Sequence, residues 1–250
     1  MEYTTINLML PTFHRVDRLE QFIESAVRTA TNKGALRFTF VVNIDDAETR
    51  KYLDEQTHIP ADHFCIIDED TDQPNLPYYF NRAYDCTPFA SDNEVVTMLG
   101  DDMVFLTTGW DVAVLAEVNA ANGAIVLHCN DAYIAREKLC VNLFTTRRVV
   151  RATTREFMCT RFHTEMIDVI WHLVGRYTNL LKYRDDIVIQ HNHGSNVNGG
   201  ARDATFFRMA PLREMANNDH ANNKWWTHAY ATYNAAKIIA AGMGSWNNLI

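Results

Sequence analysis

The sequence has no long hydrophobic run. No uninterrupted apolar stretch among its 250 residues approaches the about 20 residues that a membrane-spanning helix needs. Residues 1–5 do not start a basic region followed by an apolar stretch, which is the pattern of a secretory signal peptide. We therefore expect a cytoplasmic protein without a membrane span.

Cysteine is scarce and scattered. No two cysteines form a Cys-x-x-Cys pair, which excludes a zinc ribbon and a thioredoxin-type site. An odd number of distant thiols fits a reducing compartment. The five cysteines are Cys65, Cys86, Cys129, Cys140 and Cys159.

An excess of positive charge is also absent. The formal net charge is −8 at pH 7, which argues against a generally basic nucleic-acid surface. One local run of arginines is either a basic groove or a solvated helix face, and the second alternative is the commoner one. The run comprises Arg147, Arg148, Arg151, Arg155 and Arg161.

Short apolar runs alternate with amphipathic segments over the first 130 residues. The runs predict strands at 6–10, 38–44, 63–68, 95–99 and 124–129, and helical spacing predicts helices at 17–31, 47–56, 76–86 and 110–122. Asp17 with Glu20 resembles a capping box at the start of the first helix. This alternation predicts an α/β fold whose mostly parallel central sheet is flanked by helices.

The second half is less regular. Apolar patterning predicts strands at 138–145 and 186–190 and helices at 153–159, 164–176 and 224–241. We find no repeat and no obvious linker. The sequence therefore predicts one continuous domain with two parts, at 1–130 and 131–250.

Polar residues follow three of the predicted strands: Pro11 and Thr12, Asp45 and Asp46, and Asp101 and Asp102. Ligands of parallel sheets bind beyond the carboxyl ends of the strands, so these residues predict a site. Adjacent carboxylates suit Mg²⁺ or Mn²⁺. Taken alone, Gly100, Asp101 and Asp102 also fit an ordinary turn.

The order of these features resembles the GT-A nucleotide-sugar glycosyltransferases, particularly the inverting family-2-like group. The resemblance covers about residues 5–130 well and the rest loosely. It is carried by short motifs in a fixed order: Pro11-Thr12, a helix at 17–31, Asp45 or Asp46, Asn81, Gly100-Asp101-Asp102 and Gly109-Trp110.

The resemblance implies a Rossmann-like nucleotide-binding half at 1–130 and an acceptor-binding half at 131–250. It also implies roles for the donor-binding residues. Pro11, Thr12 and Asp45 would line the base and ribose pocket, with Asn81 and Arg82 nearby. Asp101 would face the ribose or sugar hydroxyls, and Asp102 would coordinate the Mn²⁺ or Mg²⁺ ion that bridges the diphosphate. Gly100 stands where many relatives have a further Asp.

A late histidine in such proteins often supplies a further metal ligand, and His191 or His193 is similar in position. Both would point the same way on an extended segment, although a pair of exposed loop histidines has the same pattern. The inverting relatives also present an acidic residue near the start of a helix. Asp168 is the first choice for this general base and Glu165 the second, although Glu165 also suits the helix dipole.

The sequence therefore predicts a metal-dependent glycosyltransferase that moves a sugar, UDP-linked by family frequency, to an acceptor hydroxyl with inversion. The acceptor is a saccharide or a hydroxymethylated base of viral DNA. Two alternatives stay open: a nucleotidyltransferase and a non-catalytic nucleotide- or glycan-binding module. The loop at 10–15 contains no glycine, which counts against the nucleotidyltransferase.

Overall fold

The computed structural model describes residues 2–56, 59, 63–67, 75–133, 135–154, 156–160, 166–192 and 225–247. Its strands are β1 (Thr5–Thr12), β2 (Leu36–Asn43), β3 (His63–Ile67), β4 (Glu94–Met98), β5 (Met103–Phe105), β6 (Val126–Asn130), β7 (Leu143–Thr146) and β8 (Leu181–His191). Its α-helices are α1 (Val16–Thr29), α2 (Ala47–Glu55), α3 (Leu76–Cys86), α4 (Trp110–Ala120), α5 (Arg147–Ala152), α6 (Ile167–Tyr177) and a helix at 225–240. Short 3₁₀ turns lie at Lys33–Ala35 and Arg136–Lys138.

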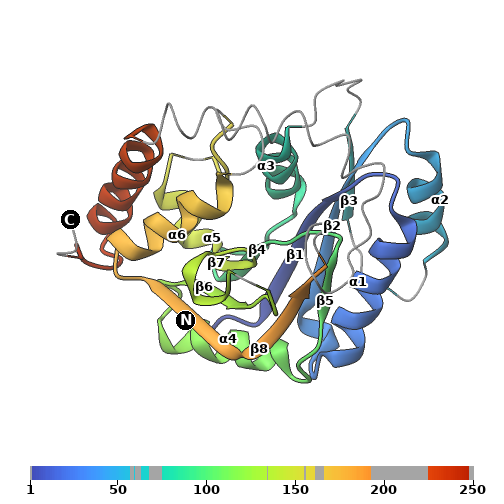
Figure 1. The fold of residues 1–250 in the computed structure, drawn as a ribbon, viewed down its shortest axis with the longest axis horizontal. Coiled ribbons are helices and arrows are strands. Elements are labelled where there is room, and N and C mark those ends of the chain that lie inside the picture. Colours follow the sequence, from blue (N-terminus) through green and yellow to red (C-terminus); the bar gives the residue numbers. More distant parts are fainter. Residues whose placement is uncertain are drawn as a thin grey trace.

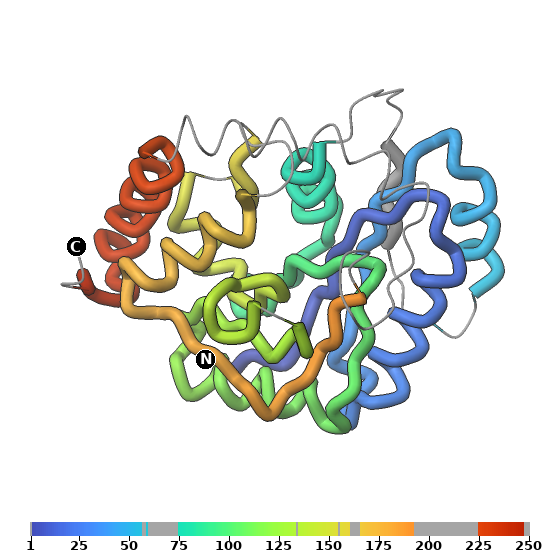
Figure 2. The backbone as a smooth tube through the Cα atoms, viewed as in Figure 1, coloured from blue at the N-terminus to red at the C-terminus, as the bar shows by residue number. Residues whose placement is uncertain are grey.

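The strands form one mixed, largely parallel sheet in the order β3-β2-β1-β4-β7-β6-β8-β5 (Figure 1). The first four strands in this order are parallel, whereas β7 runs antiparallel to both β4 and β6. Strand β8 is parallel to β6 and then pairs antiparallel with β5, as its path in Figure 2 shows. The predicted fold class is confirmed.

Two hydrophobic layers cover the sheet. Alternating residues of β1 explain this, because Leu8 and Leu10 contribute to one layer while Met9 contributes to the other. The first layer joins the sheet to α1, α2 and α4, and the second joins it to α3, α5, α6 and the helix at 225–240. With both faces covered, the loops at the strand ends remain as the place for a site.

Trp110 is a core residue. Its side chain is fully buried at the start of α4, against Phe105 and Phe144, and its indole N–H donates to the carbonyl of Ala26. A hydrogen-bonded indole inside an apolar cluster contributes to stability without polar cost. The Trp110 side chain therefore links α4 to α1.

Two local predictions were wrong. Helix α1 begins at Val16 after Arg15, so Asp17 lies inside the first turn and is not its cap. The helix predicted at 153–159 is replaced by α5, which starts earlier because Thr146 accepts a hydrogen bond from the Val149 N–H. The Thr153 hydroxyl then donates to the Val150 carbonyl where α5 ends. Side-chain hydrogen bonds of this kind compete with helix formation.

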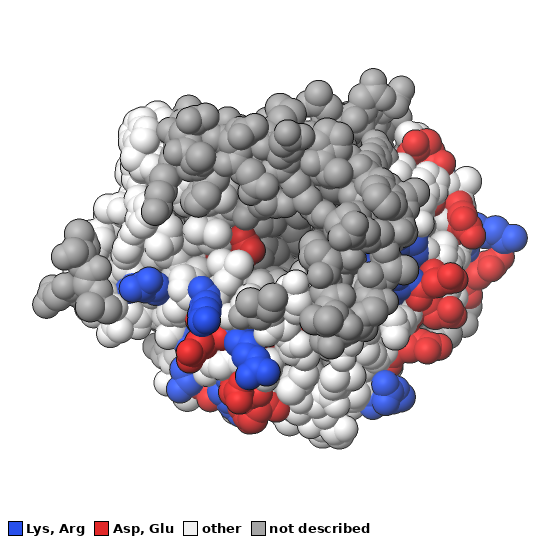
Figure 3. All heavy atoms as spheres, viewed as in Figure 1, with Lys and Arg blue, Asp and Glu red and all other residues white. Residues whose placement is uncertain are grey.

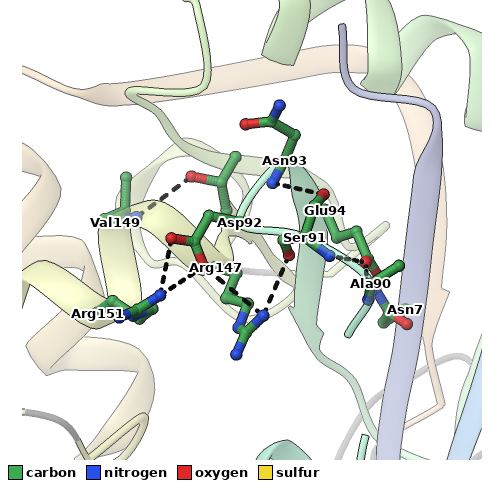
Figure 4. A network of polar contacts seen from close by, with 10 residues as sticks. Asn7, Ala90, Ser91, Asp92, Asn93, Glu94, Arg147, Val149 and Arg151 are labelled. Atoms are coloured by element: carbon green, nitrogen blue, oxygen red, sulfur yellow. Dashed lines mark hydrogen bonds and ion pairs between the residues drawn. The ribbon is translucent and has the colours of Figure 1, made fainter. Parts of the chain in front are cut away.

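The arginine run belongs in part to a structural ion-pair network. The Arg151 guanidinium donates to both carboxylate oxygens of Asp92 at 2.8 and 2.9 Å, and Arg147 lies 3.6 Å from the same carboxylate (Figure 4). The backbone N–H groups of Ala90 and Ser91 donate to Glu94 and fix the turn that holds Asp92. These contacts favour a solvated structural face over a basic groove. Arg155 and Arg161 lie outside the described residues.

Acidic side chains gather on the exterior over α1 and α2 (Figure 3). The exposed ones include Glu20, Glu24, Glu48, Asp54 and Glu55.

Within the described part of the chain, no helix is long and apolar enough to cross a membrane. Within the described residues, Cys86, Cys129, Cys140 and Cys159 are not in disulfide bonds. The division into halves at residue 130 and the cytoplasmic location stay predictions.

Candidate functional site

The acidic pair lies in a tight turn between β4 and β5. The turn is closed by a hydrogen bond from the Met103 N–H to the Gly100 carbonyl at 3.2 Å. A Cβ atom on residue 100 would lie only 2.6 Å from Oδ1 of Asp102. Glycine is therefore needed here because the Asp102 carboxylate folds back over it.

Asp101 faces β1 and is buried. Its Oδ2 accepts a hydrogen bond from the Thr12 hydroxyl at 2.9 Å, and its Oδ1 accepts one from Nη1 of Arg15 at 2.9 Å. Burial, with help from the charge of Asp102, raises the pKa of Asp101 to about 6, although Arg15 and Thr12 act in the opposite direction. Asp101 therefore anchors the turn to the carboxyl end of β1.

Asp102 faces β8 instead. Its Oδ1 lies 3.3 Å from Nε2 of His191, and its Oδ2 lies 3.8 Å from Nη1 of Arg18. Burial alone would raise the pKa of Asp102, but the hydrogen bond and charge of His191, with Arg15 and Arg18, lower it below its usual value. Asp102 is therefore held as a carboxylate beside an imidazole.

Strand β8 brings His191 to this carboxylate although 88 residues separate the two in the sequence. Met103 pairs with His191 across β5 and β8. The His191 N–H donates to the Asp131 carbonyl at 3.0 Å, and the Asn192 N–H donates to the Asp102 carbonyl at 2.8 Å. The backbone thus fixes the histidine opposite the turn, as the predicted metal role of His191 requires.

The loop between β1 and α1 is held by Asp46. Its carboxylate accepts hydrogen bonds from the His14 N–H at 2.6 Å and from the Thr49 N–H at 3.1 Å, which caps α2. His14 has a φ of 50°, which is unusual for a residue other than glycine. Asp46 is thus structural, whereas Asp45 is exposed at the end of β2, where the predicted ribose role places it.

Asp168 lies in the first turn of α6, and its Oδ1 accepts a hydrogen bond from the Val169 N–H at 2.7 Å. Burial would lower the pKa of His191, but Asp102, Asp131 and Asp168 outweigh burial and raise it. The contribution of Asp168 is the smallest of the three. The second choice for the base, Glu165, and the second histidine, His193, both lie outside the described residues.

The side chain of Asn81 is hydrogen-bonded to the backbone of Met158. Its amide donates to the Met158 carbonyl at 2.8 Å and accepts from the Met158 N–H at 2.7 Å. It thereby ties α3 to the segment before α6. Arg82 is half-buried next to it. The roles of Pro11, Thr12, Asn81 and Arg82 in nucleotide binding stay predictions.

The residues present fit a small divalent cation. Asp102 and His191 supply one carboxylate and one imidazole, whose nearest atoms are 3.3 Å apart. No group of three or more His, Cys, Asp or Glu side chains suited to a metal occurs within the described ranges. Mg²⁺ is usually bound by one or two carboxylates plus substrate phosphates. Two protein donors therefore fit an ion whose remaining ligands come from a nucleotide.

Sequence reasoning missed Arg15 and Arg18. Both arginines reach the acidic pair from the start of α1, at 2.9 and 3.8 Å. One feature of the sequence could have identified them. The two arginines are three residues apart, so they lie on one side of a helix, and they directly follow a strand that ends in a polar cluster.

Comparison with known proteins supports the fold. No known protein family matches the sequence, and no curated protein matches it. The structure is similar to S. aureus TarS 1–349, with a TM-score of 0.58 and 8% identity over 88% of this chain and 73% of that one. It is also similar to the mannosyltransferase PcManGT from Pyrobaculum calidifontis in complex with GDP-Man and Mn²⁺, with a TM-score of 0.58 and 12% identity over 97% of this chain and 77% of that one.

The fold is that of the GT-A glycosyltransferases. A further TarS 1–349 structure, in complex with UDP-GlcNAc, has a TM-score of 0.57 and 8% identity over 94% of this chain and 73% of that one. The longer TarS structure is matched over 74% of this chain but only 36% of its own length. At these identities the likeness is one of fold, and a fold hosts more than one function.

Proposed function

We propose that this protein is a metal-dependent glycosyltransferase that moves a sugar from a nucleotide sugar to an acceptor hydroxyl, with inversion at the anomeric carbon. One observation carries the proposal: Asp102 and His191 meet at 3.3 Å at the carboxyl edge of a GT-A sheet. Asp168 lies in the first turn of α6, and its charge is one of those that raise the pKa of His191.

The donor half of the mechanism follows from the acidic pair. Asp102 and His191 would hold Mn²⁺ or Mg²⁺, which when bound neutralises the charge that develops on the leaving diphosphate. Asp101, held by Thr12 and Arg15, fixes the turn that presents Asp102. The similar structures were solved with UDP-GlcNAc and with GDP-Man, and we favour a UDP sugar.

The acceptor half is assigned to Asp168. Its carboxylate accepts the proton of the acceptor hydroxyl while that oxygen attacks the anomeric carbon. The bond from the anomeric carbon to the phosphate oxygen breaks at the same centre, and the nucleoside diphosphate leaves with the electron pair. We favour a saccharide over a modified base of DNA, because a net charge of −8 opposes the approach of a polyanion.

The test is a donor panel. The protein is incubated with Mn²⁺ and a set of UDP and GDP sugars, and the released nucleoside diphosphate is measured with and without EDTA. We expect slow, metal-dependent release from one donor even without an acceptor. No release from any donor, together with no thermal shift from UDP or GDP plus Mn²⁺, contradicts the proposal.

The Asp102→Asn variant separates this function from the alternatives. A metal-dependent transferase should lose at least about 100-fold in kcat, because a bound cation supplies several kcal/mol of charge stabilisation. A non-catalytic binding module keeps its ligand affinity in the same variant. A nucleotidyltransferase would release pyrophosphate from a nucleoside triphosphate instead of a nucleoside diphosphate from a sugar nucleotide.

A further inference from the structure

The outer face of the helix at 225–240 is aromatic and nearly uncharged. Its Trp225 and Tyr233 side chains are 59% and 55% exposed. Lys237 is the single Lys, Arg, Asp or Glu residue in the described segment 225–247. Exposed apolar side chains gathered on one face mark a surface that binds a partner. The exposed residues around the two rings are small, namely Ala229, Ala236 and Ala240.

The two exposed rings are supported by neighbouring side chains. The ring centres of Trp225 and Trp226 are 4.2 Å apart, and Nζ of Lys237 lies 5.2 Å from the centre of the Tyr233 ring. Trp225 and Tyr233 are separated by about 12 Å along the helix axis, at 1.5 Å per residue. Rigid aromatic side chains provide contact area at little cost in conformational entropy. The face therefore presents two ordered rings with small side chains between them.

Helix α6 links this face to the proposed general base. Asp168 lies in the first turn of α6, and Tyr177 is the last residue of that helix. The Tyr177 hydroxyl is hydrogen-bonded to Nδ1 of His228, and the inner side of the helix at 225–240 packs into the same hydrophobic layer as α6. Figure 1 shows this helix beside α6 at the outer edge of the molecule. The aromatic face thus belongs to the half that is predicted to bind the acceptor.

The size and the charge of the face favour one kind of partner. The face is about 24 Å long and about 10 Å wide, so it covers much less than the about 800 Å² that each partner buries in a stable protein interface. Anionic membranes and nucleic acids are repelled by a protein with a net charge of −8. A neutral saccharide chain needs neither a large area nor a charge. The C–H faces of its sugar rings are apolar and pack against aromatic rings.

We propose that the outer face of the helix at 225–240 binds a neutral saccharide chain, whose sugar rings stack on Trp225 and Tyr233. A short oligosaccharide spans the distance between the two rings. This inference rests on the proposed function and deepens it, because the bound chain is the acceptor or a continuation of it. It implies that part of the affinity for the acceptor comes from a surface outside the catalytic residues.

The test measures the binding of oligosaccharides to the whole protein by calorimetry. The neutral chains are cellohexaose, maltohexaose, mannohexaose and chitohexaose, and a heparin hexasaccharide is the anionic comparison. We expect the wild type to bind at least one neutral chain and not the anionic one. Trp225→Ala and Tyr233→Ala should each lose about 10-fold or more in affinity, since aromatic residues dominate binding surfaces. Both variants should fold, because substitutions of exposed side chains cost little stability.

Two control variants separate stacking from a general loss of apolar surface. Tyr233→Phe keeps the ring, so its affinity should stay within about threefold of the wild type. Val112→Ala removes an exposed apolar side chain from α4 and should match the wild type. Equal losses in Tyr233→Phe and Tyr233→Ala would contradict stacking on that ring.

Other outcomes would also overturn the inference. They are a wild type that binds none of the neutral chains, and alanine variants that bind as tightly as the wild type. Self-association in sedimentation, or binding to vesicles of phosphatidylcholine and phosphatidylglycerol, that is lost in Trp225→Ala would assign the face to a second copy or to a membrane instead. Release of a nucleoside diphosphate without any saccharide binding overturns this inference alone. Saccharide binding without release from any donor overturns the proposed function alone.

Discussion

The hydroxyl of Thr12 donates a hydrogen bond to the Asp101 carboxylate at 2.9 Å, and this bond joins the end of β1 to a turn 89 residues further along the chain. Both side chains are buried. A buried carboxylate needs its hydrogen-bond donors, because an unmet acceptor keeps its full desolvation cost. The position of the acidic pair therefore depends on β1 as well as on its own turn.

Substitution of Thr12 with valine should lower the free energy of unfolding by about 1–3 kcal/mol, because the shape is kept and one donor to a buried carboxylate is lost. Urea denaturation measures this change. Thr12→Ser is the matched control, since it keeps the hydroxyl, and it should lose clearly less. No loss in Thr12→Val, or a larger loss in Thr12→Ser than in Thr12→Val, would contradict the role assigned to the hydrogen bond.

Gly100→Ala should weaken Mn²⁺ binding roughly 10-fold or more while the stability changes little. The new Cβ would meet Oδ1 of Asp102 at 2.6 Å, and the carboxylate can rotate away at low cost, which removes a metal ligand. Gly34→Ala is the control, because the nearest atom to its Cβ is at 3.5 Å. Mn²⁺ titration compares the two, and equal affinities would contradict the assigned role of Asp102.

Asp168→Asn should reduce kcat by about 10²–10⁴-fold, which is the usual contribution of a general base. Affinity for the nucleoside diphosphate with Mn²⁺ should stay unchanged, because the donor is held by other residues. Glu165→Gln measured in the same way should keep most of the rate. The reverse outcome, with the large loss in Glu165→Gln, would transfer the role of base to that residue.

The stability should fall as the pH falls from about 6.5 to about 4 because of His128. This side chain is fully buried in β6, and burial, with the nearby His172, lowers its pKa to about 4. Between these pH values the unfolded chain binds a proton that the folded chain does not, so acid favours unfolding. We expect the wild type to lose about 1–2 kcal/mol more than His128→Gln between pH 7 and pH 5 in urea denaturation. Equal losses of stability in the wild type and in His128→Gln between pH 7 and pH 5 would contradict this account.

The core elements could be predicted because their signals are local. The strand predicted at 38–44 and the helix predicted at 76–86 correspond to β2 and α3, since continuous apolar runs and helical spacing need no knowledge of distant residues. Strand β8 is longer than predicted at its start, where residues 181–186 are mostly polar or exposed. This segment is a strand because it pairs with β6, although its local sequence pattern does not predict a strand.

The site was predictable only in part, for the same reason. Asp101, Asp102 and His191 are predicted because the sequence resembles a family, and the structure brings Asp102 and His191 together. Arg15 was missed because an arginine next to a helix suggests a solvated face, and its partner Asp101 is 86 residues away. Asp46 was not separated from Asp45, since only the fold shows that one carboxylate caps α2 and the other is exposed.

A crystal of the protein soaked with UDP and Mn²⁺ tests the central claim most directly. The account predicts an anomalous Mn²⁺ peak within bonding distance of a carboxylate oxygen of Asp102 and Nε2 of His191, with diphosphate oxygens as further ligands. A nucleotide and metal bound elsewhere, or no anomalous peak between these two side chains at saturating Mn²⁺, would contradict it.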